Sequence, residues 1–309
     1  MEASALTRIR ALELSPARFV QLASLNAVLL WLIVGTGAAV RLTDSGLGCS
    51  HWPGCERGRP LPEKDVHAFV EFGNRLVGGV VITVTLLTWL AARRTPGLPS
   101  WVRRLAVGVL LGALAQAPLG YLAVASDLRW PVVMAHLLLS IALLAGAVVI
   151  AVEAIGLRDG RSPPIVPLEL RRLALVFTAA GFALVVSGTF ATAAGPHSGG
   201  GEHIDRFGSL QPTVYVHGAF VGAFLISFLI SIGYLAAFRE RSPLLFGIGL
   251  GVLALLLAQM AIGEIQWRTK LPWELVLLHV ALAAVVWAGT VALAALFFRP
   301  PRSLLPSNT

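Results

Sequence analysis

The sequence predicts an all-α integral membrane protein in which eight transmembrane helices form two pseudo-symmetric four-helix bundles. Three observations predict it: an apolar composition, eight long uncharged runs, and a residue spacing that recurs in both halves of the chain. Of the 309 residues, 56% are hydrophobic and only 13% are charged. A soluble domain carries about 25% charged residues, so this composition is typical of a membrane protein.

The apolar runs set the number of spans. A helix needs about 20 apolar residues to cross the hydrocarbon layer of a membrane. Eight stretches meet this requirement, at approximately residues 19–40, 68–90, 105–125, 131–153, 173–193, 213–237, 244–265 and 273–297. Because this number is even, we expect both ends of the chain on the same side of the membrane.

The net charge of +8 indicates how the chain is oriented in the membrane and does not indicate nucleic-acid binding. The basic residues occupy short loops at helix ends and form no single patch. With both termini in the cytoplasm, 15 of the 24 Lys and Arg residues fall in cytoplasmic segments and 8 in outer loops, as the positive-inside rule requires. Tryptophans gather at the outer ends as an interfacial belt, namely Trp52, Trp130, Trp267 and Trp273. We therefore expect a multi-pass plasma-membrane protein.

One spacing recurs in both halves of the chain. A glutamine precedes a histidine by 20 residues in each half, in the pairs Gln116–His136 and Gln259–His279. The two pairs are 143 residues apart, and the same offset carries Asn74 onto His217. The chain is therefore interpreted as two copies of one bundle, residues 1–160 and residues 161–309, joined by a proline-rich stretch.

Three histidines lie within the spans at one depth, about one to two turns below the outer surface: His136, His217 and His279. A lone histidine on an apolar helix is usually a packing residue, but ionisable groups inside a span are costly and usually functional. Two imidazoles on facing helices of a four-helix core can ligate a haem iron. Zinc needs a third or fourth protein ligand, and no H-x-x-x-H or C-x-x-C pattern supplies one in the spans. Haem is therefore the preferred metal group.

A second group of polar residues begins the second span. His67, Glu71, Asn74 and Arg75 follow one another at helical spacing and share one face. One interpretation is an interfacial cap in which Arg75 pairs with Glu71. The functional interpretation is a carboxylate in a dry, haem-sized pocket, where it takes or gives a proton. Arg75 would then offset that charge or bind a haem propionate.

The first outer loop contains the two cysteines of the chain, Cys49 and Cys55. Paired cysteines on the outer face of a membrane can form a disulfide. Two alternatives stay open on the residues alone: a metal site that includes His51, and a redox-active dithiol.

In combination, these residues resemble the haem A synthase family, and the resemblance runs from about residue 35 to residue 279. Its most specific parts are GAAVRLTDSGLGC at 37–49, WPGC at 52–55 and EFGNRLVG at 71–78. The resemblance implies an oxidoreductase that converts the C8 methyl group of haem O into a formyl group by successive hydroxylations, for terminal-oxidase biogenesis. The outer-loop cysteine pair is a feature of one branch of this family and is often read as a disulfide.

The resemblance also implies different tasks for the two halves. His217 and His279 would hold a haem b cofactor in the C-terminal half, and haem O would bind near His136 and Glu71 in the N-terminal half. The implied partners are haem O, a haem O synthase and a membrane electron acceptor, in a lipid bilayer. A homo-oligomer is left open.

This chain departs from the family pattern at Asn74, where many members have histidine. A neutral amide is a poor iron ligand, and His67 lies two turns outward, about 10 Å along the axis. We therefore expect His136 alone to hold the substrate haem, with Asn74 hydrogen-bonding a water at the open side. The main alternative is a cytochrome-b-like electron carrier, which predicts two complete histidine pairs. A transporter, which predicts polar residues at mid-membrane, ranks third.

Overall fold

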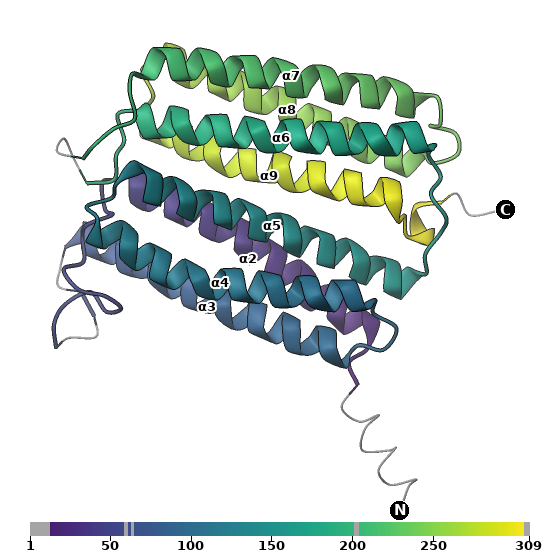
Figure 1. The fold of residues 1–309 in the computed structure, drawn as a ribbon, viewed down its shortest axis with the longest axis horizontal. Coiled ribbons are helices and arrows are strands. Elements are labelled where there is room, and N and C mark those ends of the chain that lie inside the picture. The colour runs from purple at the N-terminus through teal and green to yellow at the C-terminus, as the bar shows by residue number, and fades with distance from the viewer. Residues whose placement is uncertain (1–12, 59–60, 63–64, 201–203, 306–309) are drawn as a thin grey trace, which may run out of the picture.

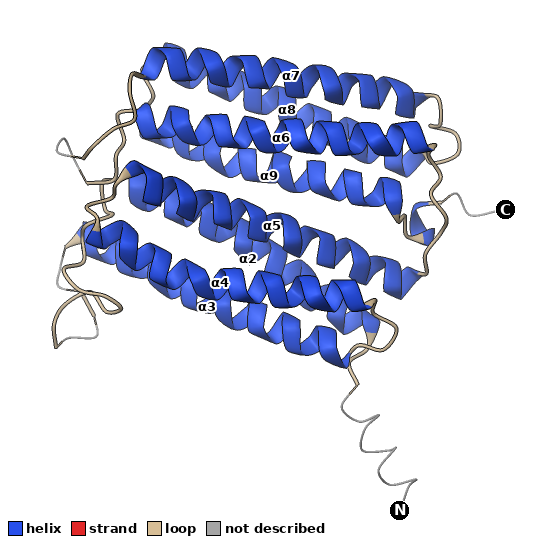
Figure 2. Ribbon diagram, in the orientation of Figure 1, coloured by secondary structure: helices blue, strands red, loops and turns tan. Residues whose placement is uncertain are grey.

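A computed structural model describes residues 13–58, 61–62, 65–200 and 204–305, and this part of the chain is helical without β-strands (Figures 1 and 2). The long helices are α2 (Pro16–Leu42), α3 (Val66–Arg94), α4 (Ser100–Ala125), α5 (Trp130–Asp159), α6 (Leu168–Ala194), α7 (Leu210–Ala236), α8 (Pro243–Arg268) and α9 (Trp273–Phe298). A short 3₁₀ helix, η1 (Arg302–Leu304), follows α9. The predicted fold class is confirmed.

Each long helix can span a membrane. The eight helices in the described ranges contain 26 to 30 residues each and are apolar enough to cross a membrane. At 1.5 Å per residue they are about 39–45 Å long, which covers the hydrocarbon layer and both interfaces. Proline in the first turn favours the starts of α2, α5 and α8, because its missing N–H would have no helical acceptor there. The protein is a multi-pass membrane protein.

The helices pack as two groups of four. Helix α2 packs against α3 and α5, and α4 packs against the same two helices; α6 and α8 have the same relation to α7 and α9. Figure 1 displays α2–α5 as one stack and α6–α9 as a second stack beside it. Helices α4 and α8 begin 143 residues apart, as do α5 and α9, so the spacing found in the sequence is a repeat in the structure.

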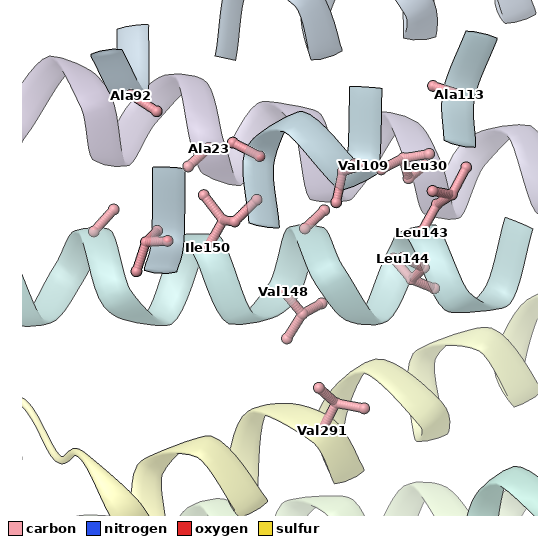
Figure 3. Close-up of a cluster of buried hydrophobic side chains, with 14 of the residues drawn as sticks. Ala23, Leu30, Ala92, Val109, Ala113, Leu143, Leu144, Val148, Ile150 and Val291 are labelled. Atoms are coloured by element: carbon pink, nitrogen blue, oxygen red, sulfur yellow. The ribbon is translucent and has the colours of Figure 1, made fainter. Parts of the chain in front are cut away.

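The two bundles meet along α2, α5, α6 and α9. The Trp31 indole donates to the Ala281 carbonyl across this interface at 3.0 Å, and Trp287 donates back to the Ile141 carbonyl at 3.1 Å. The apolar core of the first bundle extends onto α9, where Val291 faces α5 (Figure 3). Part of the apolar core is therefore shared between the two halves.

The two ends of the molecule differ. We call the end with the Cys49–Cys55 loop the disulfide end, and the opposite end, where α2 begins and α9 ends, the terminal end (Figure 1). At the terminal end, buried Glu153 forms ion pairs with Arg161 at 2.5 Å and with Arg299 at 3.1 Å. These ion pairs join α5, the α5–α6 connection and the end of α9.

Candidate functional site

His217 on α7 is oriented by the neighbouring helix α6. The Ser187 hydroxyl lies 2.9 Å from His217 Nδ1 and donates to the Leu184 carbonyl at 2.8 Å. Because its single hydrogen goes to Leu184, the hydroxyl accepts from Nδ1–H. That tautomer leaves a lone pair on Nε2, which is the form that binds a metal.

His279 on α9 faces the same bundle interior. Both predicted ligands, His217 on α7 and His279 on α9, therefore belong to the C-terminal bundle. Gln259 of α8 donates to the His279 backbone carbonyl at 2.9 Å and fixes that turn. The ring packs closely against Gly263, as the His217 ring does against Gly188. His279 Nδ1 is buried and has no hydrogen-bond partner in the described chain.

His136 on α5 repeats this arrangement in the N-terminal bundle. Gln116 of α4 donates to the His136 carbonyl at 3.1 Å, and the ring lies beside Gly120, the repeat equivalent of Gly263. Its Nδ1 atom is also buried and, among the described residues, has no partner. The Gln–His spacing in the sequence therefore corresponds to the same hydrogen bond in both bundles, from the glutamine side chain to the backbone carbonyl of the histidine.

Asn74 stands on α3 where His217 stands on α7. The Thr36 hydroxyl of α2 lies 2.7 Å from Asn74 Oδ1, a distance typical of an O–H···O bond. The amide oxygen is thereby occupied, and the Nδ2 group is left to donate elsewhere. His67 does not substitute for a second imidazole, because it lies exposed in the first turn of α3 with Nδ1 at 3.0 Å from the Ser45 hydroxyl.

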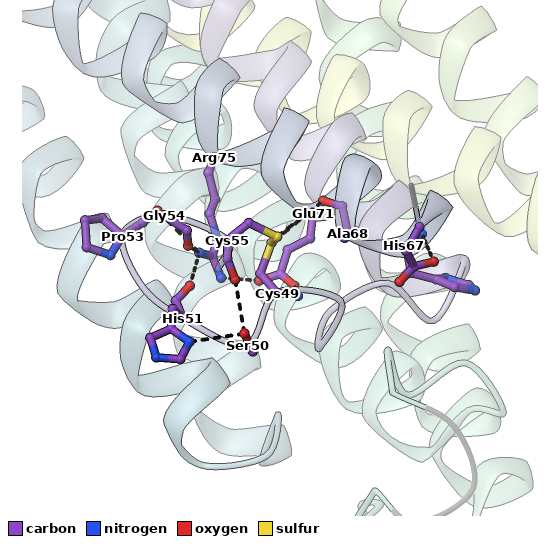
Figure 4. The surroundings of a disulfide bond; sticks show 11 residues. Cys49, Ser50, His51, Pro53, Gly54, Cys55, His67, Ala68, Glu71 and Arg75 are labelled. Carbon is purple, nitrogen blue, oxygen red and sulfur yellow. Dashed lines mark hydrogen bonds and ion pairs between the residues drawn. A yellow bond between two sulfur atoms is a disulfide. The ribbon is translucent and has the colours of Figure 1, made fainter. Parts of the chain in front are cut away.

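Glu71 is a buried carboxylate at the disulfide end, with 5% of its surface exposed. One oxygen pairs with Arg75 Nη2, and the other accepts from the Cys49 backbone N–H at 2.8 Å (Figure 4). Arg75 Nη1 also donates to the carbonyls of His51 and Gly54. Arg75 therefore pairs with Glu71, which both the interfacial-cap interpretation and the charge-offset interpretation expect.

The predicted disulfide between Cys49 and Cys55 is present, and both residues are buried. The two sulfurs lie close to the Ala68 carbonyl of α3, above Glu71 (Figure 4). A metal site built on these thiols is excluded, because the sulfurs are bonded to each other. No group of three or more His, Cys, Asp or Glu side chains in the described ranges could hold a bare metal ion.

Sequence reasoning missed Thr36 and Ser187, the hydroxyl residues that orient Asn74 and His217. Both lie on the first helix of their bundle and each touches the key residue on the second helix. The repeat search aligned only three landmarks. Their 143-residue offset carries Thr36 onto Ala179 and not onto Ser187, so the repeat alone could not have found these two hydroxyl residues.

Taken as a class, this is a membrane helical bundle with internal imidazoles on facing helices and without a multidentate site for a metal ion among its described residues. Residues 21–291 match the model of the COX15-CtaA family, described as cytochrome oxidase assembly protein. This match covers most of the chain, and the chain belongs to that family.

Several curated relatives bear the name heme A synthase. The protein from Shewanella oneidensis is 32% identical over 124 residues, covering 35% of this chain and 37% of the relative. The protein from Geobacillus thermodenitrificans is 36% identical over 107 residues, covering 34% of this chain and 33% of the relative. The protein from Symbiobacterium thermophilum is 39% identical over 104 residues, covering 32% of this chain and 32% of the relative. The aligned part spans about a third of the length of these relatives.

Proposed function

We propose that this protein is a haem A synthase, which oxidises the C8 methyl group of haem O to a formyl group by successive hydroxylations. Membership of the COX15-CtaA family and the names of the relatives support it. The observation that carries the proposal is the inequality of the two halves. One half has His217 on α7 and His279 on α9, whereas the other has Asn74 at the position equivalent to His217 and a buried Glu71 nearby.

Residues 161–309 would form the cofactor half, with haem b held between His217 and His279. The residues present fit this group, because His217 offers an Nε2 lone pair and no described protein group occupies His279 Nδ1. A flat macrocycle also needs space beside the helices. A methyl group added at Gly218 or Gly222 of α7 would meet no atom within 4 Å. Bound there, the haem would supply one-electron transfer.

Residues 1–160 would form the substrate half. His136 would ligate the iron of haem O from one side, and Asn74 Nδ2 would donate a hydrogen bond to water on the other side. Glu71 would hold or accept a proton as the methyl group is oxidised. Arg75 would keep the carboxylate charge balanced, and the Cys49 N–H would fix its direction.

The proposed orientation puts both termini in the cytoplasm and the haem sites toward the outer face of the plasma membrane. This follows from the distribution of Lys and Arg. A haem O synthase would supply the substrate, and a membrane electron acceptor would receive electrons through the cofactor half.

The test is co-expression with a source of haem O, followed by mass analysis of the extracted haems. The proposal expects new haem A, which Glu71→Gln abolishes while haem b stays bound. Glu264→Gln is the matched control, because Glu264 is an exposed carboxylate paired with Arg268 in the other half. Unchanged haem O in the parent protein would favour the cytochrome-b-like carrier. Loss of haem b from Glu71→Gln would make Glu71 a structural residue.

A further inference from the structure

An open cavity, largely exposed to the surroundings of the protein, lies between α3 and α4 at the terminal end, far from the histidines. It has a volume of about 490 Å³ and is lined by Trp89, Arg93, Arg103, Arg104 and Val107. Three of the five lining residues are arginines, so the cavity is strongly positive. The proposed oxidation uses none of these residues.

Two of the guanidinium groups are held in place by the protein. Arg93 lies over the Trp89 ring, 5.2 Å from its centroid, and Arg103 Nη2 donates to the Leu98 carbonyl at 2.8 Å. An arginine held in this way loses less side-chain entropy when it binds an anion, and its planar fork matches phosphate oxygens.

Within the described chain, none of these three arginines forms an ion pair. Four other arginines of the terminal end have carboxylate partners, which are Arg158 with Asp159, Arg161 and Arg299 with Glu153, and Arg239 with Glu240. Others among the described residues, such as Arg172 and Arg241, form no ion pair either. No ion pair from the described residues therefore compensates the positive charge around this cavity, which favours an anionic ligand.

The arginines of this cavity are not repeated at the equivalent positions of the second bundle. The 143-residue offset carries Arg93, Arg103 and Arg104 onto Ala236, Phe246 and Gly247, none of which is charged. The second bundle has its own arginines in the corresponding turn, Arg239 and Arg241, so the two turns differ in the repeat positions that carry the positive charge.

The surface next to the cavity is apolar along both helices. On α4, the exposed side chains of Val107, Leu111 and Leu114 follow at the spacing of one helical face. On α3, Leu86 lies exposed two turns from Arg93 on the same face. An amphipathic ligand fits this arrangement, with its charged group among the arginines and its hydrocarbon along these side chains. A free phosphate ion would use only the first part.

We propose that this cavity binds the headgroup phosphate of an anionic phospholipid from the leaflet in which the terminal end lies. Basic pockets between membrane helices are suited to lipid headgroups. The site does not depend on the proposed oxidation, and it would anchor the substrate half of the protein to acidic membrane.

The test uses the full-length protein, stripped of lipid in detergent and titrated with phosphatidylglycerol while its thermal unfolding is followed. Phosphatidylglycerol is expected to raise the Tm saturably, whereas phosphatidylcholine and inorganic phosphate are not. The double variant Arg93→Gln/Arg103→Gln should weaken the apparent lipid affinity at least about tenfold. The control, Arg239→Gln/Arg241→Gln, removes two arginines from the corresponding turn of the other bundle and should bind as the parent does.

Three outcomes would overturn the proposal. Equal stabilisation of both double variants would put the lipid elsewhere, and an equal response to phosphatidylcholine would remove the need for charge. A full effect of inorganic phosphate would make the cavity an anion site and not a lipid site. If the glutamine variant fails to fold, Arg93→Lys/Arg103→Lys keeps the charge without the planar fork. This variant should bind phosphatidylglycerol more weakly than the parent, and unchanged binding would contradict the role of the fork.

Discussion

Gly263→Ala tests whether the geometry of His279 holds the haem b cofactor. A Cβ atom at position 263 would lie 3.0 Å from His279 Cε1. Two carbon atoms in contact prefer about 3.5–4.0 Å, so the ring would have to move by roughly half an ångström. The backbone cannot easily follow, because Gln259 holds the His279 carbonyl.

A shift of this size exceeds the roughly 0.2 Å tolerance of a metal–ligand bond. Perturbing the surroundings of a metal ligand typically costs about 10- to 100-fold in metal affinity, and we expect a loss of haem b in that range. Alanine favours a helix over glycine by about 1 kcal/mol, so the variant should still fold.

The repeat supplies the control. Gly120→Ala would put its Cβ atom 3.5 Å from His136 Cε1, an ordinary contact that requires no movement. Both variants are purified, and their haem b content and affinity are measured by pyridine haemochrome spectra and haem titration. Gly120→Ala should match the parent protein. Equal haem b retention by Gly263→Ala and the parent would refute the reasoning.

Three further predictions use the same structure. Asn74→His should give the substrate half a second imidazole opposite His136 and convert its haem to a six-coordinate low-spin form, visible by electron paramagnetic resonance; a persistent high-spin signal would contradict this. Trp287→Phe removes the hydrogen bond to the buried Ile141 carbonyl and should lower the free energy of unfolding by about 1–3 kcal/mol, measured by denaturant unfolding; unchanged stability would show that this bond does not hold the halves together. Ser187→Ala removes the hydroxyl at His217 Nδ1 and should weaken haem b binding about tenfold or more in titrations, whereas unchanged affinity would mean that the tautomer is set otherwise.

The sequence predicted the spans and the repeat because both depend on short-range properties. A run of about 20 apolar residues has few alternatives to a membrane helix, and all eight predicted spans lie where helices occur. The Gln116–His136 and Gln259–His279 spacings predicted a duplicated bundle, and in both copies the glutamine donates to the carbonyl of its histidine. The disulfide came from the family resemblance, since the residues alone left a metal site open.

Features that depend on how helices rotate and how loops fold could not be predicted. The carbonyls to which Arg75 donates belong to the irregular loop around His51 and Gly54, whose backbone path follows no periodic sequence pattern. The hydrogen bond between Thr36 and Asn74 depends on which faces of α2 and α3 contact each other. The arginine cavity depends on how α3 packs against α4. Each of these sites joins residues from separate segments, so local patterns carried little information about it.

The central claim is that the two halves have different iron coordination. Its most direct test is an electron paramagnetic resonance spectrum of the oxidised protein loaded with haem b and haem O, recorded for the parent, His217→Ala and His136→Ala. We predict one low-spin signal that disappears in His217→Ala and one high-spin signal that disappears in His136→Ala. Two low-spin signals in the parent, or a substrate-haem low-spin signal that His67→Ala removes, would contradict the account.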